Sequence, residues 1–289
     1  GDTHPTTLRF MINLANLLGD KRELREAEQL SRTVVAAREA RLGGWHEDTL
    51  NATNILANIL WRQNKYVEAE ALFRKVMNGQ TVTLGADHRS TLFTMHNLAD
   101  VLRIQKKFVE AEKLFGTVLA AKKVLFGEDH RSNLETMASY ANLLTAQERF
   151  AEAEVLQRKV LTAFRAKLGQ HHQNSMFALN NLAVTLEEQG KLNEAEQLYR
   201  QSLTATQRKF GAGHPHSLEV VVNLGTLQMK QEKWSEAEET LRQAQDGFLK
   251  LYGATDQNTV KATIALAKAL MQQGKRQEAL KLMQQFRGQ

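Results

Sequence analysis

Six histidines recur once every 42 residues in this chain of 289, and histidine is the side chain that most often binds metals or transfers protons. A metal site needs ligands that converge within a few ångströms, whereas these histidines occur one per period. The close pairs, His171 with His172 and His214 with His216, lack the neighbouring ligands of a zinc motif. We therefore predict no metal and no cofactor. We expect each periodic histidine to have a local role in the loop that starts its period. These histidines are His4, His46, His88, His130, His172 and His214. We expect their partners to be the hydroxyl groups of Thr7, Thr49, Thr91, Ser175 and Ser217.

Other motifs that could carry chemistry are poor matches to catalytic sites. Gly190-Lys191 and Gly274-Lys275 lack the upstream glycine and the following serine or threonine of a phosphate-binding loop. Glu-Ala-Glu triplets occur in six periods, so they mark a position of a scaffold rather than a pair of catalytic acids. The sequence contains neither Gly-x-Ser-x-Gly nor His-Glu-x-x-His. We predict that the chain is not an enzyme.

The period itself extends over the whole chain without an insertion or deletion. A glycine stands three residues before each histidine, and both prolines, Pro5 and Pro215, directly follow a histidine. An aspartate, Asp256, takes the seventh histidine position. The glycines are Gly1, Gly43, Gly85, Gly127, Gly169, Gly211 and Gly253. We predict one domain, 1–289, with repeats 1–42, 43–84, 85–126, 127–168, 169–210, 211–252 and 253–289.

Composition excludes several classes of protein. The absence of cysteine excludes disulfide scaffolds, thiolate zinc sites and cysteine nucleophiles, and it suits a reducing compartment. The sequence has no apolar run of 18 residues and no signal-peptide pattern at its start. The net charge of +6 is modest, and the basic residues are dispersed. We therefore expect a cytoplasmic protein that binds neither nucleic acid nor membranes.

Each repeat is predicted to form two helices. Helix A begins near the proline position, where proline costs nothing. Helix B carries the Glu-Ala-Glu triplet in its first turn, and the alanine permits close helix packing. Between the helices, Asn64, Gly190 and Gly274 occupy a position that suits a left-handed backbone. Helix B opens at Leu24, Tyr66, Phe108, Phe150, Leu192 and Trp234.

This alternation resembles the tetratricopeptide repeat (TPR), in its 42-residue form as found in kinesin light chains and nephrocystin-like proteins. The resemblance covers the whole chain and implies an all-α, right-handed solenoid of seven repeats, with the A helices lining a concave groove that binds extended peptides. The segments that carry it are Thr49-Leu50, Gln63-Asn64-Lys65-Tyr66, Leu84-Gly85-Ala86-Asp87-His88 and Asn180-Asn181-Leu182-Ala183.

One face of helix A is rich in asparagine and holds ten of the 16 asparagines of the chain. Asparagine is a poor residue for a helix interior, so this concentration needs a reason. Its amide offers the donor and the acceptor needed to hold an extended peptide backbone. The resemblance implies that role for Asn16, Asn54, Asn58, Asn142 and Asn180. The alternative is hydrogen bonding between neighbouring A helices, which best suits the asparagines of one shared repeat position, Asn13, Asn97, Asn181 and Asn223.

Charged and aromatic residues on the same face vary along the chain. Repeats one to three combine arginines with apolar side chains, which suits a ligand with an acidic stretch and an aromatic or aliphatic anchor, as kinesin light chains bind. Repeats four to six depart from that pattern with Glu135, Glu187, Glu188 and Glu219. The predicted groove comprises Arg9, Asn16, Asn54, Asn58, Trp61, Arg62, Phe93, His96, Arg103, Asn142, Phe177 and Asn180.

The sequence therefore predicts a non-catalytic protein–protein interaction scaffold, of the adaptor or cargo-binding kind, for a protein or peptide ligand. Two alternatives stay open: a sensor array within a larger signalling protein, and a solenoid that self-assembles through its ends. The second rests on the two ends, which we expect to be uncapped: no capping segment precedes the first helix, and no polar capping helix follows the last unit, where Arg276 and Leu280 break the repeat pattern. The oligomeric state and the identity of the ligand stay open as well.

Overall fold

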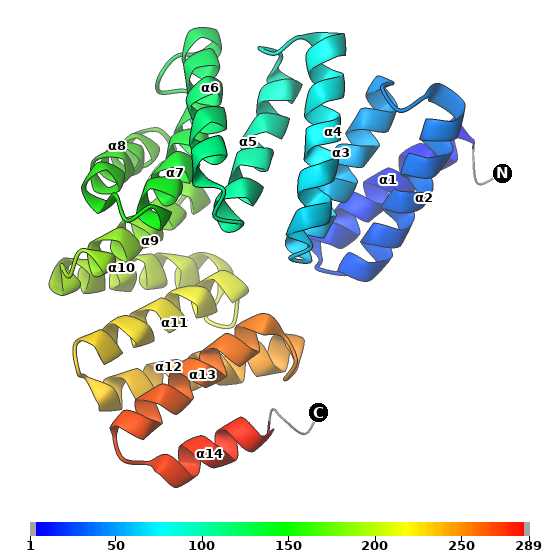
Figure 1. Cartoon of the computed structure of the whole chain (residues 1–289). Coiled ribbons are helices and arrows are strands. Elements are labelled where there is room, and N and C mark those ends of the chain that lie inside the picture. Colours follow the sequence, from blue (N-terminus) through cyan, green and yellow to red (C-terminus); the bar gives the residue numbers. More distant parts are fainter. Residues whose placement is uncertain (1–3, 286–289) are drawn as a thin grey trace. The chain divides into compact units, whose positions relative to one another are not determined.

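The computed structural model describes residues 4–285, and over that range it consists of α-helices without strands (Figure 1). One odd-numbered A helix and the following even-numbered B helix make each repeat, which confirms the predicted all-α class and helix-turn-helix repeats. Gly1 lies outside the described residues. The helices are α1 (Pro5–Asp20), α2 (Leu24–Leu42), α3 (Glu47–Arg62), α4 (Tyr66–Leu84), α5 (Arg89–Ile104), α6 (Phe108–Phe126), α7 (Arg131–Ala146), α8 (Phe150–Leu168), α9 (Gln173–Glu188), α10 (Leu192–Phe210), α11 (Pro215–Lys230), α12 (Trp234–Tyr252), α13 (Gln257–Gln272) and α14 (Arg276–Gln285).

The chain forms two compact units, 1–147 and 148–289. The first unit contains α1 to α7 and the second contains α8 to α14. Within each unit every helix packs against the next one in the sequence. Neighbouring A helices of one unit also contact each other, for example α1 and α3. A single repeat therefore shares its core with the repeats beside it, as expected for a solenoid.

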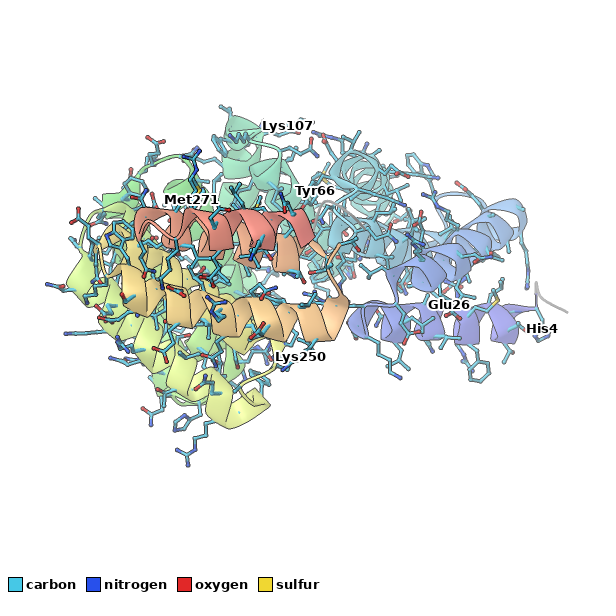
Figure 2. The ribbon with its side chains drawn as sticks, turned by 90° about the horizontal axis from the view of Figure 1, so that it is seen from below. His4, Glu26, Tyr66, Lys107, Lys250 and Met271 are labelled. Carbon is cyan, nitrogen blue, oxygen red and sulfur yellow. The ribbon has the colours of Figure 1, made fainter. Side chains whose placement is uncertain are left out.

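The six periodic histidines are the N-caps of the A helices (His4 is labelled in Figure 2). In each, Nδ1 accepts a hydrogen bond from the backbone N–H two residues later, as His172 does from Asn174 at 3.1 Å. Asp256 does the same with Asn258 at 2.8 Å. The predicted local role is confirmed, but the expected hydroxyl partners are wrong, because the backbone N–H already occupies the imidazole acceptor. The hydroxyls of Thr91, Ser175 and Ser217 instead donate to the carbonyls of Gly85, Gly169 and Gly211.

The starts of the B helices agree with the sequence prediction to the residue, at all six predicted positions. The predicted left-handed residues are also confirmed, with φ of 63° at Asn64, 76° at Gly190 and 79° at Gly274. The same conformation occurs at four residues where no glycine or asparagine marks it: Arg22, Lys106, Glu148 and Glu232.

Glu232→Gly is expected to stabilise the second unit. Glu232 is exposed and has φ of 61°, a conformation that costs a residue with a Cβ about 1–2 kcal/mol. Glycine removes that cost but loses more backbone entropy on folding, so the net gain should be up to about 1 kcal/mol. The reverse change, Gly190→Ala, should destabilise by a similar amount. Thermal unfolding followed by circular dichroism measures both, and two shifts of the same sign would contradict this account.

The alanine of each Glu-Ala-Glu triplet is buried, so the predicted close packing of helix B is confirmed. In the first unit Phe73 and Phe115 fill the core together with leucines such as Leu98. In the second unit the fully buried Tyr199 and Phe248 have comparable size.

The glutamates of the triplets join successive B helices. Arg200 binds Glu196 of its own helix at 2.7 Å, and Glu196 also accepts from Lys233 of the next repeat at 2.9 Å. The same arrangement holds for Arg32, Arg74, Arg158 and Arg242 with their neighbours. In the third repeat Gly116 takes the position of the arginine, and Glu112 accepts hydrogen bonds from Tyr140 and Gln147.

These ion pairs should make stability sensitive to acid. Burial raises the pKa of Glu196, but hydrogen bonds from Lys233, Gln231 and Arg200 outweigh it and lower the pKa to about 2. A carboxyl with a depressed pKa in the folded state stabilises that state above its unfolded pKa of 4.5 and loses this effect as pH falls towards 2. We expect Tm to be flat above about pH 5 and to fall below it.

Glu196→Gln provides the control, because it should reduce the steepness of this fall. The side chain of Arg200 is 54% exposed, so solvent screening limits one network to about 1 kcal/mol. A Tm that does not change between pH 5 and pH 2 would show that the glutamates titrate alike in the folded and unfolded states.

Candidate functional site

Asparagines of neighbouring A helices pair with one another in both units. In the first unit Asn97 donates to Oδ1 of Asn58 at 3.3 Å, and Asn58 donates to the backbone carbonyl of Asn54 at 2.9 Å. In the second unit Asn223 donates to Oδ1 of Asn180 at 3.0 Å. Hydrogen bonding along the stack is therefore real at these positions. In each pair one asparagine, Asn58 or Asn180, was predicted to bind peptide. The other, Asn97 or Asn223, was predicted to hydrogen-bond to a neighbouring A helix.

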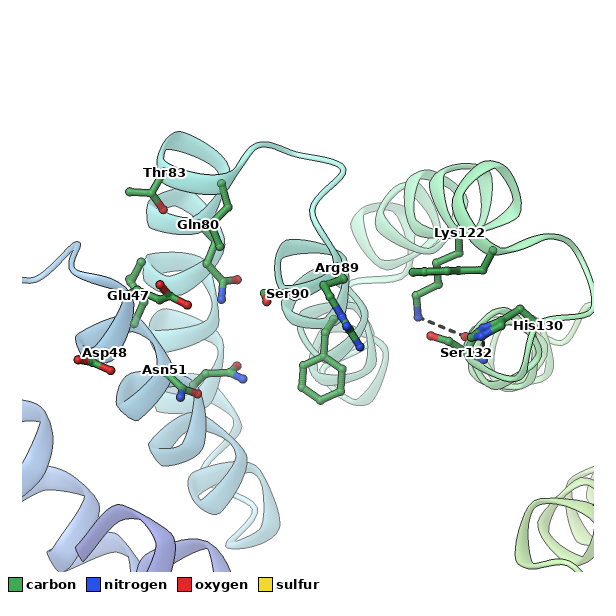
Figure 3. A pocket seen from close by; sticks show the side chains of 15 residues that line it. Glu47, Asp48, Asn51, Gln80, Thr83, Arg89, Ser90, Lys122, His130 and Ser132 are labelled. Atoms are coloured by element: carbon green, nitrogen blue, oxygen red, sulfur yellow. Dashed lines mark hydrogen bonds between the residues drawn. The ribbon is translucent and has the colours of Figure 1, made fainter. Parts of the chain in front are cut away.

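A cavity of about 560 Å³ opens beside the asparagine face of the first unit (Figure 3). Asn51 and Asn54 of α3 line it together with Phe93 of α5, a residue that is 52% exposed. Oδ1 of Asn54 is buried and has no hydrogen-bond partner among the described residues. An unsatisfied buried acceptor is costly, and a ligand N–H could relieve that cost after a small rotation of the amide.

The two ends of this cavity carry opposite charge. Figure 3 shows the carboxylates of Glu47 and Asp48 of α3 on one side and the cations of Arg89 and Lys122 on the other. A ligand that crosses the cavity would therefore meet carboxylates near the second repeat and cations near the third.

Lys122 is a residue of this site that sequence reasoning did not select. It is only 6% exposed, and its ammonium donates to the carbonyl of Ser132 at 3.2 Å and to Oγ1 of Thr136 at 2.8 Å (Figure 3 shows the first bond). Burial lowers the pKa of Lys122. The signal that could have found it is the repeat register, because Arg38 and Gln80 at the same position also bond to the next A helix.

His96 is mostly buried and belongs to a polar network. Its Nδ1 lies 3.2 Å from Oγ1 of Thr136, and its Nε2 lies 3.5 Å from the carboxylate of Asp100. Burial lowers the pKa of His96, the nearby Lys122 lowers it further, and Asp100 opposes both. Ser139 also donates to Asp100 at 3.0 Å. The network links α5, α6 and α7, so His96 has a structural partner on each side.

Two of the three predicted groove arginines are paired within the protein. Arg62 binds Asp20 at 2.8 Å, and Arg103 binds Asp100 at 3.1 Å. Arg9 is exposed on α1 and lies 6.0 Å from the ring centre of Phe10. The positive charge available to a ligand is therefore smaller than the sequence suggests.

The other predicted groove residues differ in exposure. Trp61 is half-buried and packs on the core of the first unit. Phe177 is half-buried and meets the ring of His216 edge-on, with centroids 4.8 Å apart. Asn16 is exposed and Asn142 is half-buried. The structure thus brings Asn54 and Phe93 into one cavity, whereas the rest lie along the A helices outside its lining.

The described residues contain no group of three or more histidine, aspartate or glutamate side chains arranged to hold a metal ion. Within the same range no helix is both long and apolar enough to cross a membrane.

Comparisons with solved structures find the same fold in several proteins. The TPR-like repeats of a kinesin light chain-type protein from Podosopora anserina share 26% identity, with a TM-score of 0.58 over 72% of this chain and 98% of that one. NprR in complex with the peptide NprX has 15% identity and a TM-score of 0.70, over 96% of this chain and 76% of its own. Rap in complex with competence and sporulation factor has 12% identity and a TM-score of 0.60, over 96% of both chains.

Comparison with curated proteins finds no match. Tetratricopeptide repeat sequence models, in contrast, match residues 7–48, 48–123, 96–166, 132–208, 174–248 and 216–286, which together span nearly the whole chain. The helix pairs, their period and these matches establish that the chain belongs to the tetratricopeptide repeat family, whose repeats form protein-interaction scaffolds.

Proposed function

We propose that this chain is a non-catalytic, adaptor-like scaffold that holds an extended peptide, or a disordered segment of a partner protein, against its A helices. The observation that carries the proposal is the cavity of the first unit. It combines an exposed aromatic ring, Phe93, with the unpartnered acceptor of Asn54. An aromatic or aliphatic side chain of the ligand would pack on Phe93, and a backbone N–H would bond to Asn54.

The charge at the two ends of the cavity favours one direction of binding. An acidic residue of the ligand would lie towards Arg89, and a basic residue would lie towards Glu47 and Asp48. Because Arg62 and Arg103 already have carboxylate partners, a short acidic segment fits better than a long acidic tract. One structural neighbour supports a peptide ligand, since NprR was solved with its cognate peptide NprX.

Capture of partners from a peptide library by the full chain tests this proposal, followed by mapping of the shortest bound peptide. The double variant Asn54→Ala/Phe93→Ala should weaken binding of that peptide by about 100-fold, because both contacts are lost. Asn58 is kept in this variant because its loss would also leave Asn97 without a partner.

Val109→Ala is the matched control. Val109 lies on α6, is 86% exposed and is not among the residues that line the cavity. Equal affinity of the double variant and of the wild-type chain, at unchanged helicity, would refute the proposal.

A further inference from the structure

A second cavity, of about 370 Å³, lies on the second unit between α8, α9 and α10. Its lining contains three arginines and a histidine: Arg165, His171, Arg200 and Arg208. The other lining residues are neutral, and they are Gln170, Leu179, Gln201, Thr204 and Ala205. No carboxylate is among these described lining residues, so the cavity is a concentration of positive charge.

The repeat register shows that this charge is a local departure from the pattern of the chain. Three repeats earlier, the positions of Arg165, His171 and Arg208 hold Glu39, Trp45 and Val82. In two other sets of equivalent positions, a single position is basic: Lys123 is equivalent to Arg165, and Lys250 is equivalent to Arg208. Arg165, His171 and Arg208 are the one set in which all three positions are basic. The fold therefore does not require this combination of cations.

The partners of these arginines differ from those at equivalent positions. In the first unit Glu39 forms an ion pair with Lys75 of the next repeat. At the equivalent place Arg165 donates to a neutral amide, Oε1 of Gln201, at 3.2 Å. The side chain of Arg208 has no hydrogen bond or ion pair with another described residue. Arg200 is held by Glu196 at 2.7 Å, so its guanidinium is fixed while those of Arg165 and Arg208 lack a counter-charge.

We propose that this basic cavity binds the phosphate of a phosphorylated peptide. A phosphate monoester carries close to two negative charges at neutral pH and three strong acceptor oxygens, which match two guanidinium groups without a carboxylate. The shared chemistry is a phosphate group, and the scaffold character of the family favours a peptide as its source. The site lies outside the asparagine cavity of the first unit, so the two sites can be tested separately.

Fluorescence anisotropy with two degenerate peptide libraries tests the proposal. One library has a central phosphoserine and the other has serine at that position. The full chain should bind the phosphorylated library, and Arg165→Gln/Arg208→Gln should weaken that binding by about tenfold or more. Both side chains are exposed, so the variant should fold normally. Inorganic phosphate should compete with the phosphorylated library.

Lys250→Gln is the matched control, because Lys250 occupies the repeat position of Arg208 in the next repeat (Lys250 is labelled in Figure 2). It should leave binding unchanged. Equal binding of the two libraries, an unaffected double variant, or an equal loss in Lys250→Gln would overturn the proposal. If the chain bound vesicles that contain phosphatidylinositol 4-phosphate but neither peptide library, the proposal that the phosphate comes from a peptide would be overturned. The variant Asn54→Ala/Phe93→Ala should bind the phosphorylated library normally, which separates failure of this site from failure of the groove.

Discussion

Replacing Phe115 by alanine is expected to lower the free energy of unfolding of the first unit by about 3–5 kcal/mol. Phe115 is fully buried on α6. Its ring meets His96 of α5 edge-on at a centroid distance of 5.7 Å and lies 6.2 Å from the ring of Tyr140 of α7. The change removes an aromatic side chain at the junction of three helices and leaves a cavity that the helices cannot close without moving apart.

Urea unfolding followed by circular dichroism measures this effect. Val109→Ala on the same helix is the control, since Val109 is 86% exposed and should change stability by less than about 0.5 kcal/mol. Urea midpoints that coincide for the two variants would show that Phe115 does not hold α5, α6 and α7 together.

Lys122→Glu is expected to destabilise the first unit by more than about 3 kcal/mol. The new carboxylate would be buried against the carbonyl of Ser132, an acceptor that can offer it no proton. Oγ1 of Thr136 already donates to the same carbonyl, at 3.1 Å, so it could be recruited only by breaking that bond. A buried charge without a partner is among the few changes that cost this much.

Lys123→Glu makes the same change in net charge one residue away. The side chain of Lys123 is 63% exposed and lies 3.5 Å from Glu128, so its reversal should cost about 1 kcal/mol or less. Lys122→Gln should also be tolerated better than Lys122→Glu, because Gln80 occupies the same position in the preceding repeat. Equal stability of the two glutamate variants would contradict the burial of Lys122.

Local structure was predictable because each feature of it depends on residues within one repeat. Leu24 and Trp234 begin helices as expected, since an apolar residue at that position must face the core. The left-handed residues were found where glycine or asparagine marks them and were missed at Lys106 and Glu232, because the backbone there is imposed by the turn and not by the side chain.

Contacts between repeats were harder to predict. The sequence placed asparagines on one face of helix A, but whether Asn58 meets a ligand or Asn97 depends on the offset between two helices. That offset comes from core packing and leaves no mark in the spacing of the asparagines. The role of Lys122 was missed for the same reason, since its two acceptors lie on the following helix.

Photocrosslinking at Phe93 tests the central claim most directly, namely that a peptide lies across the A helices of the first unit. Benzoylphenylalanine keeps the aromatic ring at Phe93, and the same group at Val109 of α6 serves as the comparison. The captured peptide should crosslink at position 93 and not at position 109. Crosslinking at position 109 alone, or to the same extent at both positions, would contradict the account.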